Sequence, residues 1–235
     1  MTQRHIIASA FLVIVAVAIA SCGNSGKKND NKTGEKVAEK VLNNRLLIIV
    51  DPQVDFTTGS LAVAKGPETM TLLAEAVEKG VWKKYNHIVV TQDNHPANHC
   101  SFVEQGGIFP PHCVQGTEGA TVYPLLQEKL TAVSNDITIH YLTKGDLVDK
   151  EEFSIFQNEK NAAVLTKLID NSQFDGIDIC GIATDYCVFE TLTDLLTFYP
   201  AHKVRVVTNC IAAVDESDTK LAELIEKEKI ETVQF

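Results

Sequence analysis

The sequence predicts a three-layer α/β/α domain with a mostly parallel, roughly six-stranded sheet. Short apolar runs recur along the chain from Arg45 onward, and stretches with apolar residues at helical spacing lie between them. Strands that alternate with helices in this way predict right-handed crossovers. Such crossovers place the strands parallel and cover both faces of the sheet with helices. We find no internal repeat in the chain.

Six apolar runs are the predicted strands. The first two are nearly continuous and rich in β-branched residues, which is typical of strands buried on both faces. The six runs span residues 46–50, 87–91, 137–142, 177–182, 204–208 and 232–235.

Three sets of apolar residues have the spacing of a helix face. The first set lies between the first and second predicted strands, the second between the fourth and fifth, and the third between the fifth and sixth. In that order they are Met70, Leu73, Val77 and Val81; Val188, Leu192, Leu195 and Leu196; Leu221, Leu224 and Ile225.

The composition is that of one globular domain. The chain has 235 residues, of which 45% are hydrophobic and 22% are charged. Its formal net charge is -10 at pH 7, and no basic stripe is present. Because phosphate binding needs concentrated Lys and Arg, the sequence argues against a nucleic-acid partner.

Residues 1–21 have the layout of a lipoprotein signal peptide. Arg4 gives a positive start, and residues 6–20 carry no charge but are short for a membrane helix, which needs ~20 residues. The end of this segment, Ile19-Ala20-Ser21-Cys22, resembles the lipobox of bacterial lipoproteins, which implies cleavage before Cys22 and a lipid on that residue. The alternatives are an uncleaved anchor and an ordinary signal peptide. Mass spectrometry of the membrane fraction separates them, because a mature chain that starts elsewhere than Cys22 contradicts the lipobox.

Residues 22–43 form the predicted tether of a domain that spans 44–235. The tether is rich in Gly, Asn, Lys and Glu, and it has too few apolar side chains to offset the entropy of ordering. We therefore expect a domain anchored by lipid to a bacterial membrane, outside the cytoplasm, on the periplasmic face or the cell surface. Homo-oligomerisation stays open.

Five cysteines remain after Cys22, at positions 100, 113, 180, 187 and 210. Export favours disulfides, but an odd number leaves at least one thiol unpaired if all bridges are intramolecular. Cys180 lies in a predicted strand and Cys210 just after one, so a buried, inert thiol is expected for both.

Chemically active side chains follow four of the predicted strands. Asp51 follows the first, Asp93 and His95 follow the second, Lys144 follows the third, and residues 183–187 follow the fourth. In open α/β sheets the ligand site lies beyond the carboxyl ends of the strands. The sequence therefore predicts that these groups meet at one edge of the sheet.

Cys187 is the candidate nucleophile because it lies where a strand gives way to a helix. Thr184 or Asp185 can cap that helix and leave Cys187 in its first turn. The free N–H groups and the positive helix end there favour thiolate, and they can hold an oxyanion. A packed structural cysteine is the alternative.

Asp51 and Lys144 complete the candidate trio. A thiol nucleophile needs a base for its proton and a cation to organise the charges, and no histidine lies beside Cys187. Taken singly, Asp51 can cap a turn or pair with a surface cation, and Lys144 can be a solvated lysine.

Three segments resemble nicotinamidases and their relatives in the isochorismatase-like superfamily of cysteine hydrolases. They are LIIVDPQVDFTTGSL at 47–61, TKG at 143–145 followed by FSIF at 153–156, and GIATDYCV at 181–188. The resemblance extends from Arg45 to the C-terminus. It implies Cys187 as nucleophile, Asp51 as general base and then acid, and Lys144 as their positive partner. It also implies a cis peptide bond between residues 182 and 183, with the N–H groups of Ala183 and Cys187 as the oxyanion hole.

Carboxylate and imidazole groups gather between the second and third strands. Asp93 and His95 are two residues apart, and His99 and His112 follow. These are the donors that zinc, manganese or iron selects, although an Asp-x-His pair alone can simply hydrogen-bond to the backbone. The resemblance implies Asp93, His95 and His112 as ligands of a divalent metal, most readily zinc. Isochorismatase-type relatives lack this set, so it favours the nicotinamidases among the relatives. His99 matches a histidine of some nicotinamidases and ranks below those three as a ligand.

The resemblance also implies an aromatic substrate pocket. Phe56 matches a residue that packs on the substrate ring, Phe109 stands where many nicotinamidases have tryptophan, and His99 is placed with them among the substrate-binding residues. The expected reaction is hydrolysis of nicotinamide to nicotinate and ammonia through a cysteine thioester. The alternatives are an enzyme of the same superfamily that hydrolyses another small amide, and a catalytically silent surface binding protein.

Overall fold

The computed structural model describes residues 44–235. The predicted signal peptide and tether, residues 1–43, lie outside the described residues. None of the helices within 44–235 has the length and apolar character that crossing a membrane requires.

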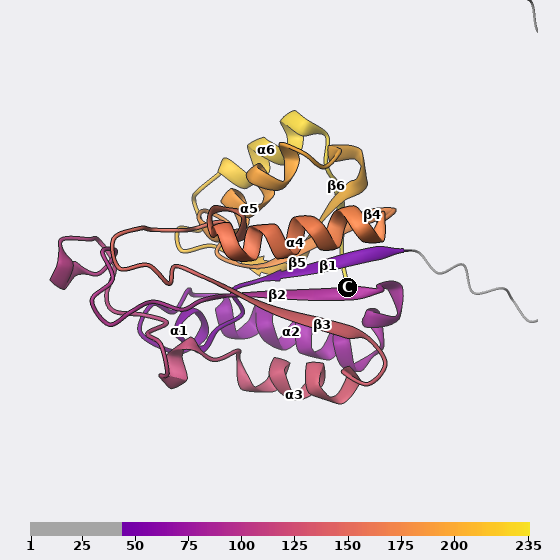
Figure 1. Cartoon of the computed structure of the whole chain (residues 1–235). Helices are drawn as coiled ribbons and strands as arrows, with labels where there is room; N and C mark the ends of the chain where they lie inside the picture. Colours follow the sequence, from indigo (N-terminus) through magenta and orange to yellow (C-terminus); the bar gives the residue numbers. More distant parts are fainter. Residues whose placement is uncertain (1–43) are drawn as a thin grey trace, which may run out of the picture. The chain divides into compact units, whose positions relative to one another are not determined.

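A six-stranded, all-parallel sheet forms the centre of the domain, in the order β3-β2-β1-β4-β5-β6 (Figure 1). This confirms the predicted architecture. The strands are β1 (Arg45–Val50), β2 (His87–Asp93), β3 (Thr138–Lys144), β4 (Gly176–Ile182), β5 (Val204–Ala212) and β6 (Glu231–Val233). The largest difference from the sequence is at β5, which continues four residues beyond the predicted run, past a register shift against β4.

Within residues 44–235 the α-helices are α1 (Val54–Thr57), α2 (Gly66–Glu78), α3 (Pro124–Val133), α4 (Glu159–Ser172), α5 (Cys187–Leu196) and α6 (Lys220–Glu228). Helices α2 and α3 lie on one face, and α4, α5 and α6 lie on the other (Figure 1). The predicted helical residue Val81 lies beyond the end of α2, because Gly80 takes a left-handed conformation (φ 93°) that stops the helix and starts a short 3₁₀ turn.

Each face of the sheet has its own apolar core. Leu47 and Ile49 of β1 point toward the α2 side, whereas Leu46, Ile48 and Val50 point toward the α5 side. All five are fully buried, as the nearly continuous apolar run predicts. β1 therefore occupies the middle of the domain, and its burial fixes the position of the residue that follows it, Asp51.

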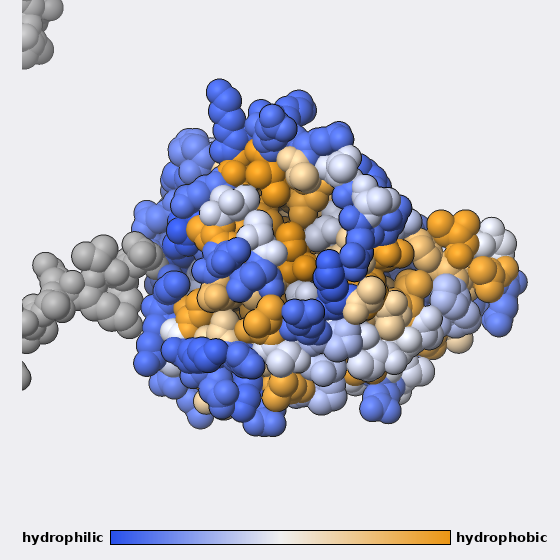
Figure 2. Space-filling model, turned by 180° about the vertical axis from the view of Figure 1, so that it is seen from behind, coloured by the Kyte–Doolittle hydropathy of each residue, from blue (hydrophilic) through white to orange (hydrophobic). Residues whose placement is uncertain are grey.

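Polar residues form most of the margin of the surface shown in Figure 2, with apolar residues toward the middle of that face and at the tip of the projecting segment. Val103 and Ile108, both exposed, belong to the long connection between β2 and α3.

The five cysteines within residues 44–235 are all free thiols. Cys180 and Cys210 are fully buried, as expected, and Cys210 lies inside β5 rather than after it. Burial raises the pKa of the Cys210 thiol to about 12 and that of Cys180 well above its usual value, so neither is a reactive thiolate.

Candidate active site

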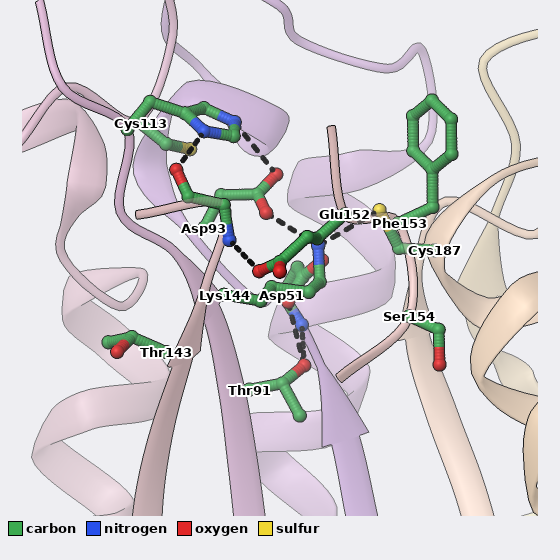
Figure 3. Close-up of polar contacts among 12 residues, drawn as sticks. Asp51, Thr91, Asp93, Cys113, Thr143, Lys144, Glu152, Phe153, Ser154 and Cys187 are labelled. Atoms are coloured by element: carbon green, nitrogen blue, oxygen red, sulfur yellow. Dashed lines mark hydrogen bonds and ion pairs between the residues drawn. The ribbon is translucent and has the colours of Figure 1, made fainter. Parts of the chain in front are cut away.

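Asp51, Lys144 and Cys187 meet at the carboxyl edge of the sheet (Figure 3). Asp51 follows β1, Lys144 ends β3, and Cys187 begins α5. The Lys144 Nζ atom lies 2.9 Å from Asp51 Oδ2 and 3.5 Å from Cys187 Sγ. The structure therefore brings together all three residues that the sequence singles out.

A turn in the backbone and one hydroxyl group orient Asp51. Its φ of 45° is in the left-handed region, which Asp tolerates better than most residues other than glycine. The Thr91 Oγ1 atom donates to Asp51 Oδ1 at 2.7 Å, and the Asp51 N–H lies 3.2 Å from the carbonyl oxygen of Thr91. Asp51 is thus fixed from the neighbouring strand β2.

Burial and a shared cation set the charges of this cluster. Burial raises the pKa of Asp51, against the attraction of Lys144. For Lys144, burial alone would lower the pKa, but Asp51 and Asp93 together raise it well above its usual value. Lys144 is therefore an ammonium ion at neutral pH, and Asp51 has the raised pKa that suits a group exchanging protons.

Cys187 is a buried thiol in this arrangement. Burial raises its pKa well above the ordinary value, while Lys144 acts in the opposite direction. The thiol must therefore lose its proton to a base. The Cys187 sulfur and a carboxylate oxygen of Asp51 lie within 4.8 Å of each other, which places that base at hand.

The predicted side-chain cap of α5 is wrong. The N-cap residue is Tyr186, and no side chain caps the helix. The carboxylate of Asp185 instead accepts the backbone N–H groups of Val214 and Asp215, at 3.0 and 2.8 Å. Asp185 therefore fastens the segment after β5 to the turn that carries the nucleophile.

Two amide N–H groups are free to hold an oxyanion. The peptide bond between Ile182 and Ala183 is cis, as the resemblance implies. Within the described residues, the N–H groups of Ala183 and Cys187 do not donate to backbone carbonyls in turns, loops or caps. At the first position of α5, Cys187 also has no partner inside the helix. Both groups belong to the turn around the sulfur, which is the placement that an oxyanion hole needs.

Asp93, His95 and His112 form a set of metal-ligand type. One donor atom of each lies within 4.8 Å of the others, and all three residues are buried. The Nδ1–H of His95 donates to the carbonyl of Gly145 and that of His112 donates to the carbonyl of Pro110, both at 2.8 Å. These hydrogen bonds leave the Nε2 lone pairs free.

The same set has an unsatisfied polar atom, as a cation site should. The Nε2 atom of His95 is buried without a hydrogen-bond partner and lies 3.5 Å from Asp93 Oδ2. Backbone carbonyls that fix the imidazole tautomers are the usual outer shell of a metal centre. The residues present therefore fit a divalent metal with nitrogen and oxygen ligands.

Gln53 holds the backbone of Asp93 in place. Its side-chain oxygen accepts the Asp93 N–H and its side-chain nitrogen donates to the Asp93 carbonyl, each at 2.7 Å. Lys144 Nζ also contacts Asp93 Oδ1 at 2.5 Å. One ammonium group thus pairs with both the candidate base and the candidate metal ligand.

An aromatic cavity opens above the nucleophile. Its free space is about 380 Å³, part of which is open to solvent. The ring of Phe109 meets those of His112 and Tyr186 edge-on, at 5.7 Å between centroids in both cases. The lining residues are Phe56, Leu61, Asp93, Phe109, His112, Glu151, Phe153, Ala183, Tyr186, Cys187 and Val214.

His99 does not line this cavity, in contrast to the prediction that it binds substrate. Its Nε2–H donates to the carbonyl of Lys150 at 3.0 Å, and its Nδ1 accepts the N–H of Ser101 at 3.3 Å. Its ring stacks on His95, with centroids 4.0 Å apart. His99 therefore packs against the imidazole of His95, a candidate metal ligand, and holds its orientation.

The family that is described as the isochorismatase domain matches residues 45–233. The chain belongs to the isochorismatase family. Among curated members, the nicotinamidase of Escherichia coli (strain K12) is 31% identical over 183 residues, which are 70% of this chain and 81% of that protein. The nicotinamidase/pyrazinamidase of Mycobacterium tuberculosis is 32% identical over 193 residues, or 77% of this chain and 98% of its own.

Two solved structures of the isochorismatase fold share this level of identity. The pyrazinamidase of Pyrococcus horikoshii in complex with zinc is 31% identical, has a TM-score of 0.68, and aligns over 82% of this chain and 99% of its own. PnC1 from L. infantum in complex with nicotinate is 31% identical, has a TM-score of 0.70, and aligns over 82% and 93%. These relatives confirm the prediction of an amide hydrolase.

Several cavity residues of this isochorismatase family member were not predicted from the sequence. Tyr186 directly precedes the nucleophile, and Phe153 belongs to a segment already noted for its resemblance. Val214 follows β5, so the rule that sites lie beyond strand ends would have found it had β5 been extended to Ala212. Glu151 gives no such signal, because only the fold of the long β3–α4 connection brings it to the cavity.

Proposed function

We propose that the chain hydrolyses nicotinamide to nicotinate and ammonia with the help of a divalent metal. The observation that carries this proposal is that a buried Asp51–Lys144–Cys187 trio and an Asp93–His95–His112 donor set adjoin one aromatic cavity. Cys187, Asp93 and His112 line that cavity themselves. Curated relatives at 31% and 32% identity are named nicotinamidases, and the structure of one relative holds nicotinate.

The first half of the reaction forms a thioester. Asp51 takes the proton from the Cys187 thiol, and the sulfur attacks the amide carbonyl carbon. The electron pair displaced from the carbonyl double bond resides on oxygen, where the N–H groups of Ala183 and Cys187 stabilise it. As the oxyanion collapses, the carbon–nitrogen bond breaks, and Asp51 returns its proton to the leaving nitrogen, which departs as ammonia.

The second half releases the acid. Asp51 accepts a proton from water, and the resulting hydroxide adds to the thioester carbonyl. The carbon–sulfur bond then breaks and the sulfur regains the proton from Asp51. The product forms as the carboxylic acid, which gives its remaining proton to solvent and leaves as the carboxylate. Throughout, Lys144 keeps its charge and holds Asp51 in reach of the sulfur.

The aromatic rings of the cavity suit a flat heteroaromatic amide. Phe56, Phe109, Phe153 and Tyr186 contribute ring faces and edges, and a phenyl group at 109 can still pack on a pyridine ring. Asp93, His95 and His112 would hold the metal, for which zinc is the first choice since the P. horikoshii relative binds it. When bound, the metal supplies a Lewis acid for the ring nitrogen of the substrate.

Replacing Cys187 with alanine tests the proposal. Ammonia release from nicotinamide should fall by a factor on the order of 10⁴ or more, because no other group in the cavity can form the thioester. Cys100→Ala is the matched control: this thiol is partly buried but does not line the cavity, so the variant should keep wild-type turnover. Substantial turnover by Cys187→Ala would rule the thioester route out, and wild-type protein that releases no ammonia would rule out the activity itself.

A further inference from the structure

Glu151 is a carboxylate on the cavity wall for which the proposed reaction has no use. It lines the same cavity as Asp93, His112 and Cys187. One of its oxygens lies within 4.8 Å of a ring nitrogen of His95 and of His99. His95 is thus common to two donor groups, one with Asp93 and His112 and one with Glu151.

The segment that carries Glu151 is fastened to the imidazoles. The Gly145 carbonyl accepts from His95, and the Lys150 carbonyl accepts from His99. The carboxylate of the next residue, Glu152, accepts the Gly145 N–H at 2.8 Å and the side-chain amide of Asn158 at 2.9 Å. This segment is therefore a fixed part of the site rather than a loose surface loop.

Glu151 has no cation of its own within the described residues. The nearest cation along the chain, Lys150, pairs with Glu152 Oε1 at 2.8 Å, and none of the ion pairs in this part of the chain includes Glu151. Its only hydrogen bond is local, from the N–H of Glu152 to Oε1 at 3.1 Å. Within the described residues, the second carboxylate oxygen takes part in no protein hydrogen bond or ion pair, as the same contacts show.

The other member of this second group, His99, is not available as a ligand. Its Nε2 carries the proton donated to Lys150, and its Nδ1 lone pair accepts from Ser101. Metal binding through His99 would break one of these hydrogen bonds. Glu151 can turn about its own side-chain bonds without breaking the contacts that fix its segment.

We propose that Glu151 is a fourth protein donor to the divalent metal held by Asp93, His95 and His112. The proposal rests on the metal dependence put forward above. Because an anionic oxygen donor strengthens the binding of a divalent cation, it makes a direct prediction about metal affinity.

Glu151→Gln is the test, with Asp149→Asn as the matched control. Both changes remove one negative charge from the same segment, but Asp149 is exposed and belongs to neither donor group. Zinc affinity is measured on metal-free full-length protein by competition with a chromogenic chelator. We expect the Kd for zinc to rise tenfold or more in Glu151→Gln. We expect it to stay within twofold of wild type in Asp149→Asn.

Cobalt gives a second readout that a purely structural role would not change. The visible absorption bands of bound Co²⁺ report its ligands, so they should differ between Glu151→Gln and wild type and coincide between Asp149→Asn and wild type. Unchanged zinc affinity and cobalt bands in Glu151→Gln would overturn the proposal, as would equal losses in both variants. Wild-type protein that binds no metal would overturn it too, whereas ammonia release, measured separately, decides the proposed activity.

Discussion

Replacing Lys144 with methionine is expected to abolish activity and to lower the free energy of unfolding by roughly 3–5 kcal/mol. Lys144 is fully buried and pairs with two carboxylates, Asp51 and Asp93, both of which are also buried. Methionine fills a similar volume but leaves two buried negative charges close together without a cation. Urea denaturation of metal-free protein, followed by circular dichroism, measures the loss of stability.

Between pH 7 and 5 the stability of this variant should depend more steeply on pH than that of wild type, in which Asp51 has a raised pKa and Asp93 a lowered one. In wild type, the attraction of Lys144 opposes burial and the pKa of Asp93 lies below its usual value, so its contribution to stability is lost as pH falls below about 4. Without Lys144, burial and mutual repulsion raise the pKa of both carboxyls, so folding takes up protons. The stability of Lys144→Met should therefore rise as pH falls from 7 toward 5.

Lys79→Met is the control for this experiment. The side chain of Lys79 is 74% exposed, and its one ion pair among residues 44–235 is with Glu75, one helical turn away. Its replacement should change the free energy of unfolding by less than about 1 kcal/mol at any pH. A loss of this small size for Lys144→Met would contradict the role of Lys144 as the cation of the buried cluster.

Gly145→Ala should weaken metal binding at least tenfold and lower kcat/KM on the order of 100-fold. Gly145 has a left-handed φ of 66°, and a Cβ atom built there would lie 2.4 Å from His95 Cε1. The added methyl group must displace the imidazole that Gly145 itself orients through its carbonyl. Chelator competition for zinc and steady-state kinetics measure the two effects.

Gly106→Ala separates the clash from the backbone strain. Gly106 also has a left-handed φ, 90°, but a Cβ atom there would meet nothing within 4 Å. Both variants carry the strain of a positive φ, on the order of 1–2 kcal/mol, whereas only Gly145→Ala crowds His95. If the two variants had the same zinc affinity and kcat/KM, His95 would have moved to accommodate the methyl group without loss of metal binding or activity.

The sequence was informative about the site wherever a functional residue sits at the end of a strand. Asp51, Asp93 and Lys144 each follow or end an apolar run that is visible in the hydropathy of the sequence. A parallel sheet brings the carboxyl ends of such strands to one edge, independent of the conformation of the loops between them. The same reasoning placed Cys187 at the start of a helix. The family resemblance then supplied the roles of these residues.

Contacts between loops were beyond the reach of these patterns. The sequence suggested that Asp185 caps α5, yet its carboxylate binds two N–H groups after β5. His99 was expected in the pocket, yet it bonds to the N–H of Ser101 in its own segment and to the carbonyl of Lys150, which belongs to the β3–α4 connection. In both cases a polar side chain had several partners within reach of its own segment, and only the three-dimensional course of another segment selects among them.

The order of the strands determines how the site comes into being. Asp51, Asp93, Lys144 and Cys187 stand at the ends of four adjacent strands, β3-β2-β1-β4, whose members are far apart along the chain. No single supersecondary unit contains the whole trio, so we expect no activity from a chain in which only some of these strands have paired. Turnover therefore reports that these four strands have paired, and its recovery during refolding should track the slowest long-range strand pairing rather than the earlier formation of helices.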